Sequence, residues 1–353
     1  MNGENPVSAG LSWRVLHSIV ESTPAEWEAL SQGRPFQSYG WYAYGERVMA
    51  DCRPAYVLVT QEGRAVARAT FFLVRNEPLP LPPSLRWPFQ VLFRYRPLLI
   101  CRSPLSSTSG LVVPEAPLRQ AILRVLVAAA RQLAQEQRAS FVMFDFLEEE
   151  QTRWEGWPEE AVAVTVPQPG TRMEILWSSF EEYLAHLSPK ARKHYRQHQR
   201  AAERMGVTLT FQERVTDVKT ALRLIRAVER RHRAAPNPWA RRMLEEAWRV
   251  EGRWLEARLA GRMVGGELIL ADEGVQLVTA LGLAGKVPNV YFLLGYADIR
   301  HAIEHGRRAL RWGSGAYEVK RRLGFTLEMN NHALVMAQGN FARLMRWFQE
   351  KPC

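Results

Sequence analysis

Apolar and polar positions along the chain alternate between strand-like and helix-like spacing. Residues 55–75 contain two apolar runs separated by Glu62-Gly63, which predicts two strands joined by a turn. Residues 116–137 have apolar side chains at helical spacing and predict a long amphipathic helix. The apolar run 140–147 then predicts a buried strand, whereas the proline-rich stretch 79–88 predicts a loop.

The second half of the chain repeats this mixture. Ser188-Pro189 and Gly206 have the residue types of a helix start and a helix end. The remaining predicted elements are a strand at 207–214, a helix at 217–234, a short helix ending at Gly252, three strands within 253–285, a helix at 288–306 and a strand entering the turn at 313–315. The pattern predicts an α/β or α+β protein of two domains, with their junction near 154–177.

Composition narrows the class of protein. The 353 residues are 47% hydrophobic and 24% charged, as expected for a soluble globular protein with room for two domains. No apolar run reaches the roughly 20 residues of a membrane-spanning helix, and the first ten residues lack the pattern of a signal peptide. Three scattered Cys are too few for a disulfide framework or a zinc site, which favours a reducing cytoplasm.

Charge is distributed unevenly between the halves. Residues 1–165 hold 16 Arg, no Lys and 17 acidic residues, so the remainder holds 31 basic and 19 acidic residues. The second half therefore has a net charge of +12, which indicates an anionic partner such as nucleic acid, a phosphate-bearing cofactor or a membrane surface. A solvated basic surface is the alternative interpretation.

The most basic stretch is LSPKARKHYRQHQRAAERMG, residues 187–206. At helical spacing its basic residues share one face, and a second face is expected to pack on the core. The basic face consists of Lys193, Arg196, Arg200 and Arg204, and the second of Ala191, Tyr195, His198, Ala202 and Met205. His194 and His198 are four residues apart, but no third ligand is near them in sequence, so we expect no metal site.

The sequence contains none of the specific motifs of nucleotide-binding loops, metalloproteases, serine hydrolases or paired-cysteine sites. Instead, a strand ending at 279–285 leads directly into the helix from Pro288, with Lys286 just before it. Such a helix start presents unpaired N–H groups to a phosphate, although an ordinary strand-to-helix connection has the same appearance. After the next strand, Tyr317, Glu318 and Lys320 follow a glycine-rich turn, where the Lys is either a functional donor or part of a surface basic cluster.

Together these segments resemble the Fem-like branch of the GNAT acyltransferase superfamily. The resemblance runs from about residue 13 to 326 and is strongest from 180 onward. It is carried by GRPFQSYGWYAYGE, the basic stretch through GVTL, LEARLAGRMVGGELIL, NVYFLLGYADIRHAIEHG and WGSGAYEVKRRLGF. Tyr317, Lys320 and Gly324 occupy a pattern similar to the closing motif Y-x-x-K-x-x-x-G of this branch.

This resemblance implies two GNAT-like domains, residues 1–165 and 166–353, each a mixed twisted sheet flanked by helices, with the donor site in the second. It implies transfer of an acyl group to an amine, from acyl-CoA or from aminoacyl-tRNA. The usual pyrophosphate loop is replaced by LAGKVPNVYF, and the P-R-G-P motif of the bridge ligases is reduced to ICRSPLSS. Both departures leave the donor open.

The resemblance also assigns roles to individual residues. It implies no metal-binding residue. Such a transferase needs oxyanion donors, a proton acceptor and a proton donor for the leaving group. The predicted catalytic residues are Glu267, Tyr317, Glu318 and Lys320. The predicted donor-binding residues are Ala280, Leu281, Gly282, Lys286, Asn289 and Tyr291. The predicted substrate-binding residues are Lys190, Arg192, Lys193 and Trp312.

Three functions follow from this interpretation. We favour an acyl-CoA-dependent N-acyltransferase in the cytoplasm, acting on a small molecule or a cell-envelope precursor without a tightly bound cofactor. An aminoacyl-tRNA-dependent transferase would suit the basic second half. A non-catalytic binder of nucleic acid or of an anionic surface is the third, because a fold does not fix a function. Peripheral membrane contact and the oligomeric state stay open at this stage.

Overall fold

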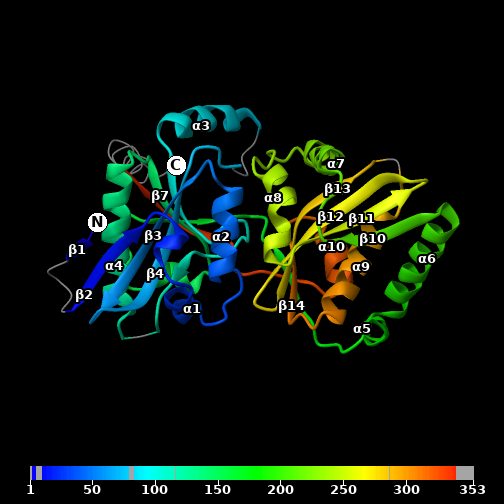
Figure 1. Ribbon diagram of the computed structural model, residues 1–353, viewed down its shortest axis with the longest axis horizontal. Coiled ribbons are helices and arrows are strands. Elements are labelled where there is room, and N and C mark those ends of the chain that lie inside the picture. The colour runs from blue at the N-terminus through cyan, green and yellow to red at the C-terminus, as the bar shows by residue number, and fades with distance from the viewer. Residues whose placement is uncertain (1, 5–9, 79–82, 116, 286, 339–353) are drawn as a thin grey trace, which may run out of the picture. The chain divides into compact units, whose positions relative to one another are not determined.

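The computed structural model describes residues 2–4, 10–78, 83–115, 117–285 and 287–338, which form two compact units (Figure 1). The N-terminal unit runs to Pro167 and includes the described residues from Met329 onward, and the C-terminal unit is Gln168–Glu328. The predicted domain boundary at residue 165 lies close to Pro167, where the chain first passes from the N-terminal to the C-terminal unit. The prediction that all later residues belong to the second domain is wrong, because the final strand hydrogen-bonds within the first sheet.

The N-terminal unit has helices on both faces of one mixed sheet. Its elements are β1 (Asn2–Glu4), β2 (Leu11–Leu16), the 3₁₀ helix η1 (Ile19–Glu21), α1 (Pro24–Ser31), α2 (Tyr39–Val48), β3 (Arg53–Gln61), β4 (Arg64–Val74), α3 (Pro83–Tyr95), β5 (Leu98–Cys101), β6 (Leu111–Val112), α4 (Arg119–Glu136), β7 (Phe141–Leu147), η2 (Glu150–Arg153), β8 (Val162–Thr165) and β16 (His332–Ala337). The strand order is β1-β2-β3-β4-β5-β7-β16-β8, and β6 pairs with β4.

Side-chain alternation along β3 explains why both faces are covered. Val57 and Val59 point into a core shared with α4, whereas Tyr56 contacts Trp27 of α1 and lies near Tyr42 of α2. A strand that is apolar on both faces must be covered on both, which gives three layers.

The C-terminal unit has the same three-layer plan. Its elements are β9 (Thr171–Glu174), α5 (Phe180–His186), α6 (Pro189–Met205), β10 (Val207–Gln212), α7 (Val218–Arg231), α8 (Ala240–Glu246), η3 (Ala247–Val250), β11 (Arg253–Leu259), β12 (Arg262–Asp272), β13 (Val275–Leu283), α9 (Val290–Glu304), β14 (Ala309–Trp312), α10 (Tyr317–Arg322) and β15 (Thr326–Leu327). The strand order is β10-β11-β12-β13-β14-β9-β15. Helix α9 packs on one face with α5 and α6 beside it, and α7 packs against β12 and β13.

Each sheet contains one parallel pair, and a helix connects its two strands. β5 and β7 are parallel with α4 between them in sequence, and β13 and β14 are parallel with α9 between them. The other pairings are antiparallel among the described residues. The fold is thus a pair of mixed α/β domains, as the sequence predicted.

One local prediction was wrong. The stretch 79–88 was predicted to be a loop; its described part, from Pro83, begins helix α3, which contains Pro88. The basic segment after the turn at 313–315, for which no element was predicted, forms the short helix α10. In both segments an element boundary falls within a few residues of Pro or Gly, where local sequence predicts boundaries poorly.

Candidate active site

The parallel strands β13 and β14 separate part-way along their length. They pair only from Val275 to Val278 and from Ala309 to Trp312, after which β13 continues alone to Leu283. Its residues Ala280 to Gly282 pair with β12 on the other edge. Their second backbone edge has no strand partner among the described residues, so its polar groups can face a ligand. Ala280, Leu281 and Gly282, which were predicted to bind the acyl donor, lie on this edge.

A β-bulge lies at the point of separation. Leu268 pairs with Ala280 and Ile269 with Val278, so Thr279 is the extra residue. The Thr279 hydroxyl is buried without a hydrogen-bond partner. Bulges bend a strand and redirect its side chains, and they are frequent beside active sites.

Two glycines allow helices to pack closely on the two faces of the sheet at this edge, α9 on one face and α7 on the other. A Cβ at Gly265 would lie 2.5 Å from the Val290 side chain, and one at Gly282 would lie 2.8 Å from Leu224 of α7. The helix N-terminus therefore lies directly on β12, while α7 packs on the opposite face. Lys286, predicted to bind the donor, lies outside the described residues.

Asn289, the residue before α9, contacts a side chain of another helix. Asn289 has a left-handed backbone, with φ of 70°, and its side chain does not cap α9. Its Oδ1 is instead 2.9 Å from Nδ1 of His198 on α6. The first N–H groups of α9 consequently have no side-chain cap from Asn289, which leaves them oriented toward an anion.

His198 belongs to the packed face of α6. It stacks on Phe292 at 4.3 Å between ring centroids, and its Nε2 lies 3.1 Å from the ring nitrogens of His194. Burial and the neighbouring His194 lower the pKa of His198. No group of three or more potential metal ligands occurs among the described residues.

The two faces predicted for α6 are confirmed. His198 and Ala202 are buried, and Lys193, Arg196, Arg200 and Arg204 are exposed. Of the residues predicted to bind substrate, Lys190 and Lys193 are exposed. Arg192 instead donates to the carbonyls of Ala185 and Leu187, at 2.7 and 2.8 Å, and so satisfies the C-terminal end of α5.

Two acids are buried between the sheet and α9. Glu267 on β12 is 4% exposed and Asp298 on α9 is 0% exposed. Asp298 accepts hydrogen bonds from Trp312 Nε1 at 2.6 Å and from Gln276 Nε2 at 2.7 Å, whereas Glu267 Oε1 has no partner. His301 Nδ1 lies 2.9 Å from Gln276 Oε1, which extends the network.

Burial favours the protonated form of both acids. It raises the pKa of Glu267 well above its ordinary value, and repulsion from Asp298 adds to the effect. Burial raises the pKa of Asp298 to about 7, against the hydrogen bonds from Trp312 and Gln276. The pKa of Tyr291 rises to about 12 through burial and the nearby Glu267. Glu267 and Tyr291 are therefore two groups with perturbed pKa values that influence each other electrostatically, which makes both candidates for proton exchange.

Trp312 occupies the interior of the unit. Its indole is 6% exposed, stacks on Phe325 at 4.3 Å, and donates to Asp298. The prediction that Trp312 contacts the substrate disagrees with this burial. Its contacts instead give it the role of orienting the Asp298 carboxylate.

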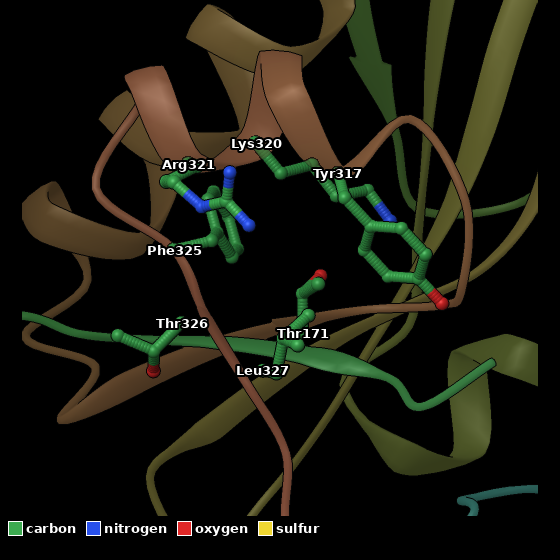
Figure 2. Close-up of a pocket in the computed structure, with 7 residues that line it drawn as sticks. All are labelled: Thr171, Tyr317, Lys320, Arg321, Phe325, Thr326 and Leu327. Carbon is green, nitrogen blue, oxygen red and sulfur yellow. The ribbon is translucent and has the colours of Figure 1, made fainter. Parts of the chain in front are cut away.

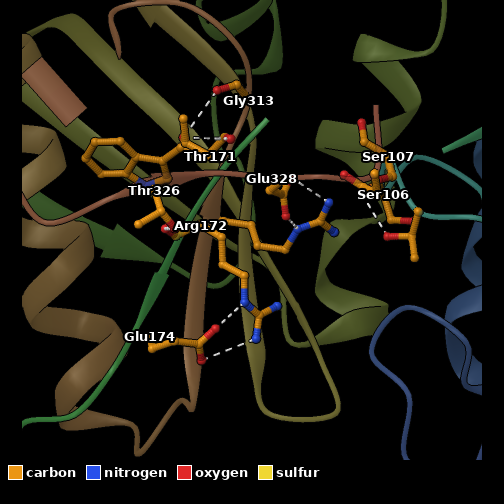
Figure 3. Close-up of polar contacts among 12 residues, drawn as sticks. Ser106, Ser107, Thr171, Arg172, Glu174, Gly313, Thr326 and Glu328 are labelled. Atoms are coloured by element: carbon orange, nitrogen blue, oxygen red, sulfur yellow. Dashed lines mark hydrogen bonds and ion pairs between the residues drawn. The ribbon is translucent and has the colours of Figure 1, made fainter. Parts of the chain in front are cut away.

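A pocket of about 310 Å³ lies where the chain leaves β14 (Figure 2). Its lining residues are Thr171, Tyr317, Lys320, Arg321, Phe325, Thr326 and Leu327. The Lys320 ammonium donates to the Gly313 carbonyl. Thr171 donates to the Trp312 and Gly313 carbonyls at 3.1 and 3.5 Å (Figure 3). These bonds fix the turn through which β14 departs from β13.

Burial lowers the pKa of Lys320 to about 8, partly offset by Glu328. Glu328 also forms a buried ion pair with Arg311 of β14, with one contact at 3.0 Å (Figure 3). Tyr317 donates to the Pro169 carbonyl at 2.9 Å, and Glu318 is exposed and pairs with Arg321. Of the predicted catalytic residues, the structure groups Tyr317 with Lys320 at the pocket and places Glu267 in the acid network.

The acid network contains residues that sequence reasoning missed. Asp298, Gln276 and His301 were not predicted, although Asp298 is the one acid between Val290 and Ile303, in an otherwise apolar helix sequence. An acid at a buried helical position signals a partner or a function, because an unpaired buried charge is costly.

Residues 189–321 match the family described as the acetyltransferase (GNAT) domain. No curated protein matches the chain. Among solved structures, FemX is 12% identical with a TM-score of 0.61, covering 96% of this chain and all of that one.

Two further solved structures are similar in fold. A tandem GNAT protein from the clavulanic acid biosynthesis pathway is 15% identical with a TM-score of 0.57, covering 93% of this chain and 99% of that one. The C-terminal domain of a putative lysylphosphatidylglycerol synthetase from Agrobacterium fabrum is 12% identical with a TM-score of 0.52, covering 94% and 97%. Residues 189–321 thus match a GNAT acetyltransferase domain, and the chain as a whole shares the fold of these two-domain Fem-like and tandem GNAT structures.

Proposed function

We propose that the C-terminal unit transfers an acyl group from acyl-CoA to a primary amine of a small molecule or a cell-envelope precursor. The observation that carries the proposal is the separation of β13 from β14 beyond Val278. It exposes a backbone edge beside the uncapped start of α9, which suits a thioester carbonyl and a pyrophosphate respectively. Asn289 would contribute to the pyrophosphate end of this site.

The chemistry needs one proton acceptor and one proton donor. The amine nitrogen attacks the thioester carbon, and the oxyanion that forms accepts from N–H groups of the Ala280–Gly282 segment. Glu267 takes the amine proton, directly or through a water molecule. The C–S bond then breaks, and the CoA thiolate takes a proton from Tyr291, whose hydroxyl lies in the electrostatic environment of Glu267.

Lys320 acts in this scheme as a positioning residue. Its ammonium holds the Gly313 carbonyl and thereby fixes where β14 ends. Tyr317 anchors the same turn through Pro169, and the exposed Glu318 has only Arg321 as an ion-pair partner among the described residues. We therefore assign proton transfer to Glu267 rather than to Glu318. Buried thiols at Cys52 and Cys101 suit a reducing compartment, so we assign the reaction to the cytoplasm.

The test is a screen of the purified chain with acetyl-CoA and longer acyl-CoAs against amino sugars and amino acids. Release of CoA, quantified by chromatography, is expected with at least one amine. Acyl-CoA alone should raise the melting temperature, because a ligand that binds only the native state stabilises it. Absence of both CoA release and a melting shift would reject the acyl-CoA donor.

A second candidate donor is aminoacyl-tRNA, favoured by the exposed basic face of α6. Retention of charged tRNA on a filter should then fall steeply with salt, because each phosphate contact releases counterions. If tRNA is retained and its aminoacyl group is transferred while acyl-CoA is inert, this candidate replaces the first. Retention without any transfer would favour a non-catalytic binder.

The start of α6 gives a separate prediction. Lys190→Gln with Lys193→Gln should raise the KM for the anionic donor about 5- to 25-fold at unchanged kcat, since each lost contact with a phosphate weakens binding by about 1 kcal/mol. Arg192→Gln should instead lower the melting temperature by about 2–4 °C, because two carbonyls of α5 lose their donor. An unchanged KM in the double variant would assign α6 to the solvated surface.

A further inference from the structure

Helix α3 exposes a continuous apolar stripe. Trp87 is 71% exposed, Val91 39% and Tyr95 75%, and the three are spaced by four residues, which aligns them on one side of the helix. Phe93 is 3% exposed and Phe89 contacts it at 5.7 Å, so the opposite side packs inward. The helix therefore packs through its inner side and exposes its outer side to solvent.

This clustering is unusual within the chain. The other exposed large apolar residues of the described part are scattered along the chain, except that Leu327 and Met329 are two residues apart: Val20, Val164, Leu176, Phe211, Trp248, Leu327 and Met329. Scattered apolar residues are normal on a protein surface, whereas a contiguous stripe marks an interaction site.

The charged residues around the stripe indicate the sign of the partner's charge. No Asp or Glu occurs between Glu77 and Glu115, while Arg86, Arg94 and Arg96 lie in or next to α3. Arg94 and Arg96 are exposed, and Arg94 lies beside Trp87 and Val91 on the helical wheel. An anionic partner complements this segment.

We propose that α3 is a docking helix for an anionic lipid surface. Trp and Tyr are suited to the membrane interface because each has an apolar ring and a polar atom, and flanking Arg residues bind lipid phosphates. The aliphatic Val91 between the two rings favours acyl chains over nucleic-acid bases, which stack on aromatic rings only. This proposal does not depend on the acyl donor or acceptor.

The geometry fits a helix that lies on the bilayer. Thirteen residues of α-helix are about 20 Å long, short of the roughly 30 Å hydrocarbon core. Among the described residues, no helix combines the length and apolarity needed to cross a membrane. The helix would lie parallel to the surface, with Trp87, Val91 and Tyr95 between the headgroups.

The test is flotation of the full-length chain with vesicles of phosphatidylcholine alone or with added phosphatidylglycerol. Binding is expected only with the anionic vesicles and should weaken with salt. Trp87→Ser with Tyr95→Ser should lower the partition constant about 100-fold, since burying each large side chain contributes roughly tenfold. Arg94→Gln with Arg96→Gln should lower it about 30-fold.

The matched control variants remove exposed apolar side chains or exposed charges that lie outside α3. Leu176→Ser with Met329→Ser removes exposed apolar side chains, and Arg196→Gln with Arg200→Gln removes exposed charges from α6. Both controls should bind vesicles like the wild type, and the α3 variants should keep the wild-type melting temperature. Equal losses in the controls, equal binding to neutral vesicles, or binding to RNA but not vesicles would overturn the proposal. A dimer in light scattering that the Trp87/Tyr95 variant dissociates would assign the stripe to a second copy.

Discussion

Replacing Glu267 by Gln is expected to lower kcat by about 10²- to 10⁴-fold, the range that a positioned general base contributes. Glutamine keeps the size of the side chain but cannot accept the amine proton. Wild-type kcat should rise with pH through the raised pKa of Glu267, and this dependence should be missing from the variant. The measurement is kcat against pH for both proteins, with the acyl-CoA and amine found in the screen.

The same substitution should change stability in the opposite direction. Glu267 has a higher pKa in the folded chain than in the unfolded chain, so folding favours its protonated form. The stabilising contribution is complete below the unfolded pKa of about 4.3 and is lost as pH rises toward the folded value. Glu267→Gln should therefore melt at a higher temperature than the wild type at alkaline pH and lose this advantage near pH 4.

Glu318→Gln is the matched control, because Glu318 is exposed and pairs with Arg321 on the surface. It should leave kcat within about twofold of the wild type, since surface ion pairs contribute little. If Glu318→Gln removes activity while Glu267→Gln retains it with an unchanged pH profile, the proton acceptor has been assigned to the wrong carboxylate. A more stable but inactive Glu267→Gln variant excludes misfolding as the cause of inactivity.

Local sequence signals predicted most elements of the C-terminal unit. The limits of α6 follow from a Ser188 hydroxyl that accepts from the Ala191 N–H, and from Gly206, which has a left-handed φ of 72°. These signals act within one helical turn, so a single sequence reveals them. The return of β16 to the first sheet depends on pairing between residues far apart in sequence, such as Leu334 and Phe144, which are 190 positions apart, and no local pattern encodes it.

The sequence predicted only those parts of the candidate site whose residues lie close together along the chain. Residues 280–282 and Asn289 are neighbours in sequence, and they lie near the end of β13 and the start of α9 as expected. Asp298 lies near Glu267 only because β12 packs beneath α9, and Trp312 reaches Asp298 through the parallel β13–β14 pairing. Trp312 was predicted to bind substrate but is buried. An aromatic residue near a turn has the same sequence signature whether it binds a ligand or fills the core.

Asp298→Asn should alter both stability and the pH dependence of catalysis. Trp312 and Gln276 each donate to one Asp298 oxygen, and the asparagine NH₂ group would face one of these donors. The unmatched polar group should cost about 1–3 kcal/mol of folding free energy. At the same time, Glu267 loses the repulsion that helps to raise its pKa, so the pH at which kcat/KM reaches half its maximum should fall.

The direction of that pH shift separates an electrostatic role from a structural one. Arg311→Met breaks the buried pair with Glu328 on the same strand as Trp312 and should also lower the melting temperature, but it leaves both acids in place. Its pH profile should match the wild type. If Asp298→Asn and Arg311→Met shift the profile equally, the shift comes from loosened packing and Asp298 does not tune Glu267. If only Asp298→Asn shifts it, to lower pH, Asp298 is the residue that raises the proton affinity of the proposed base.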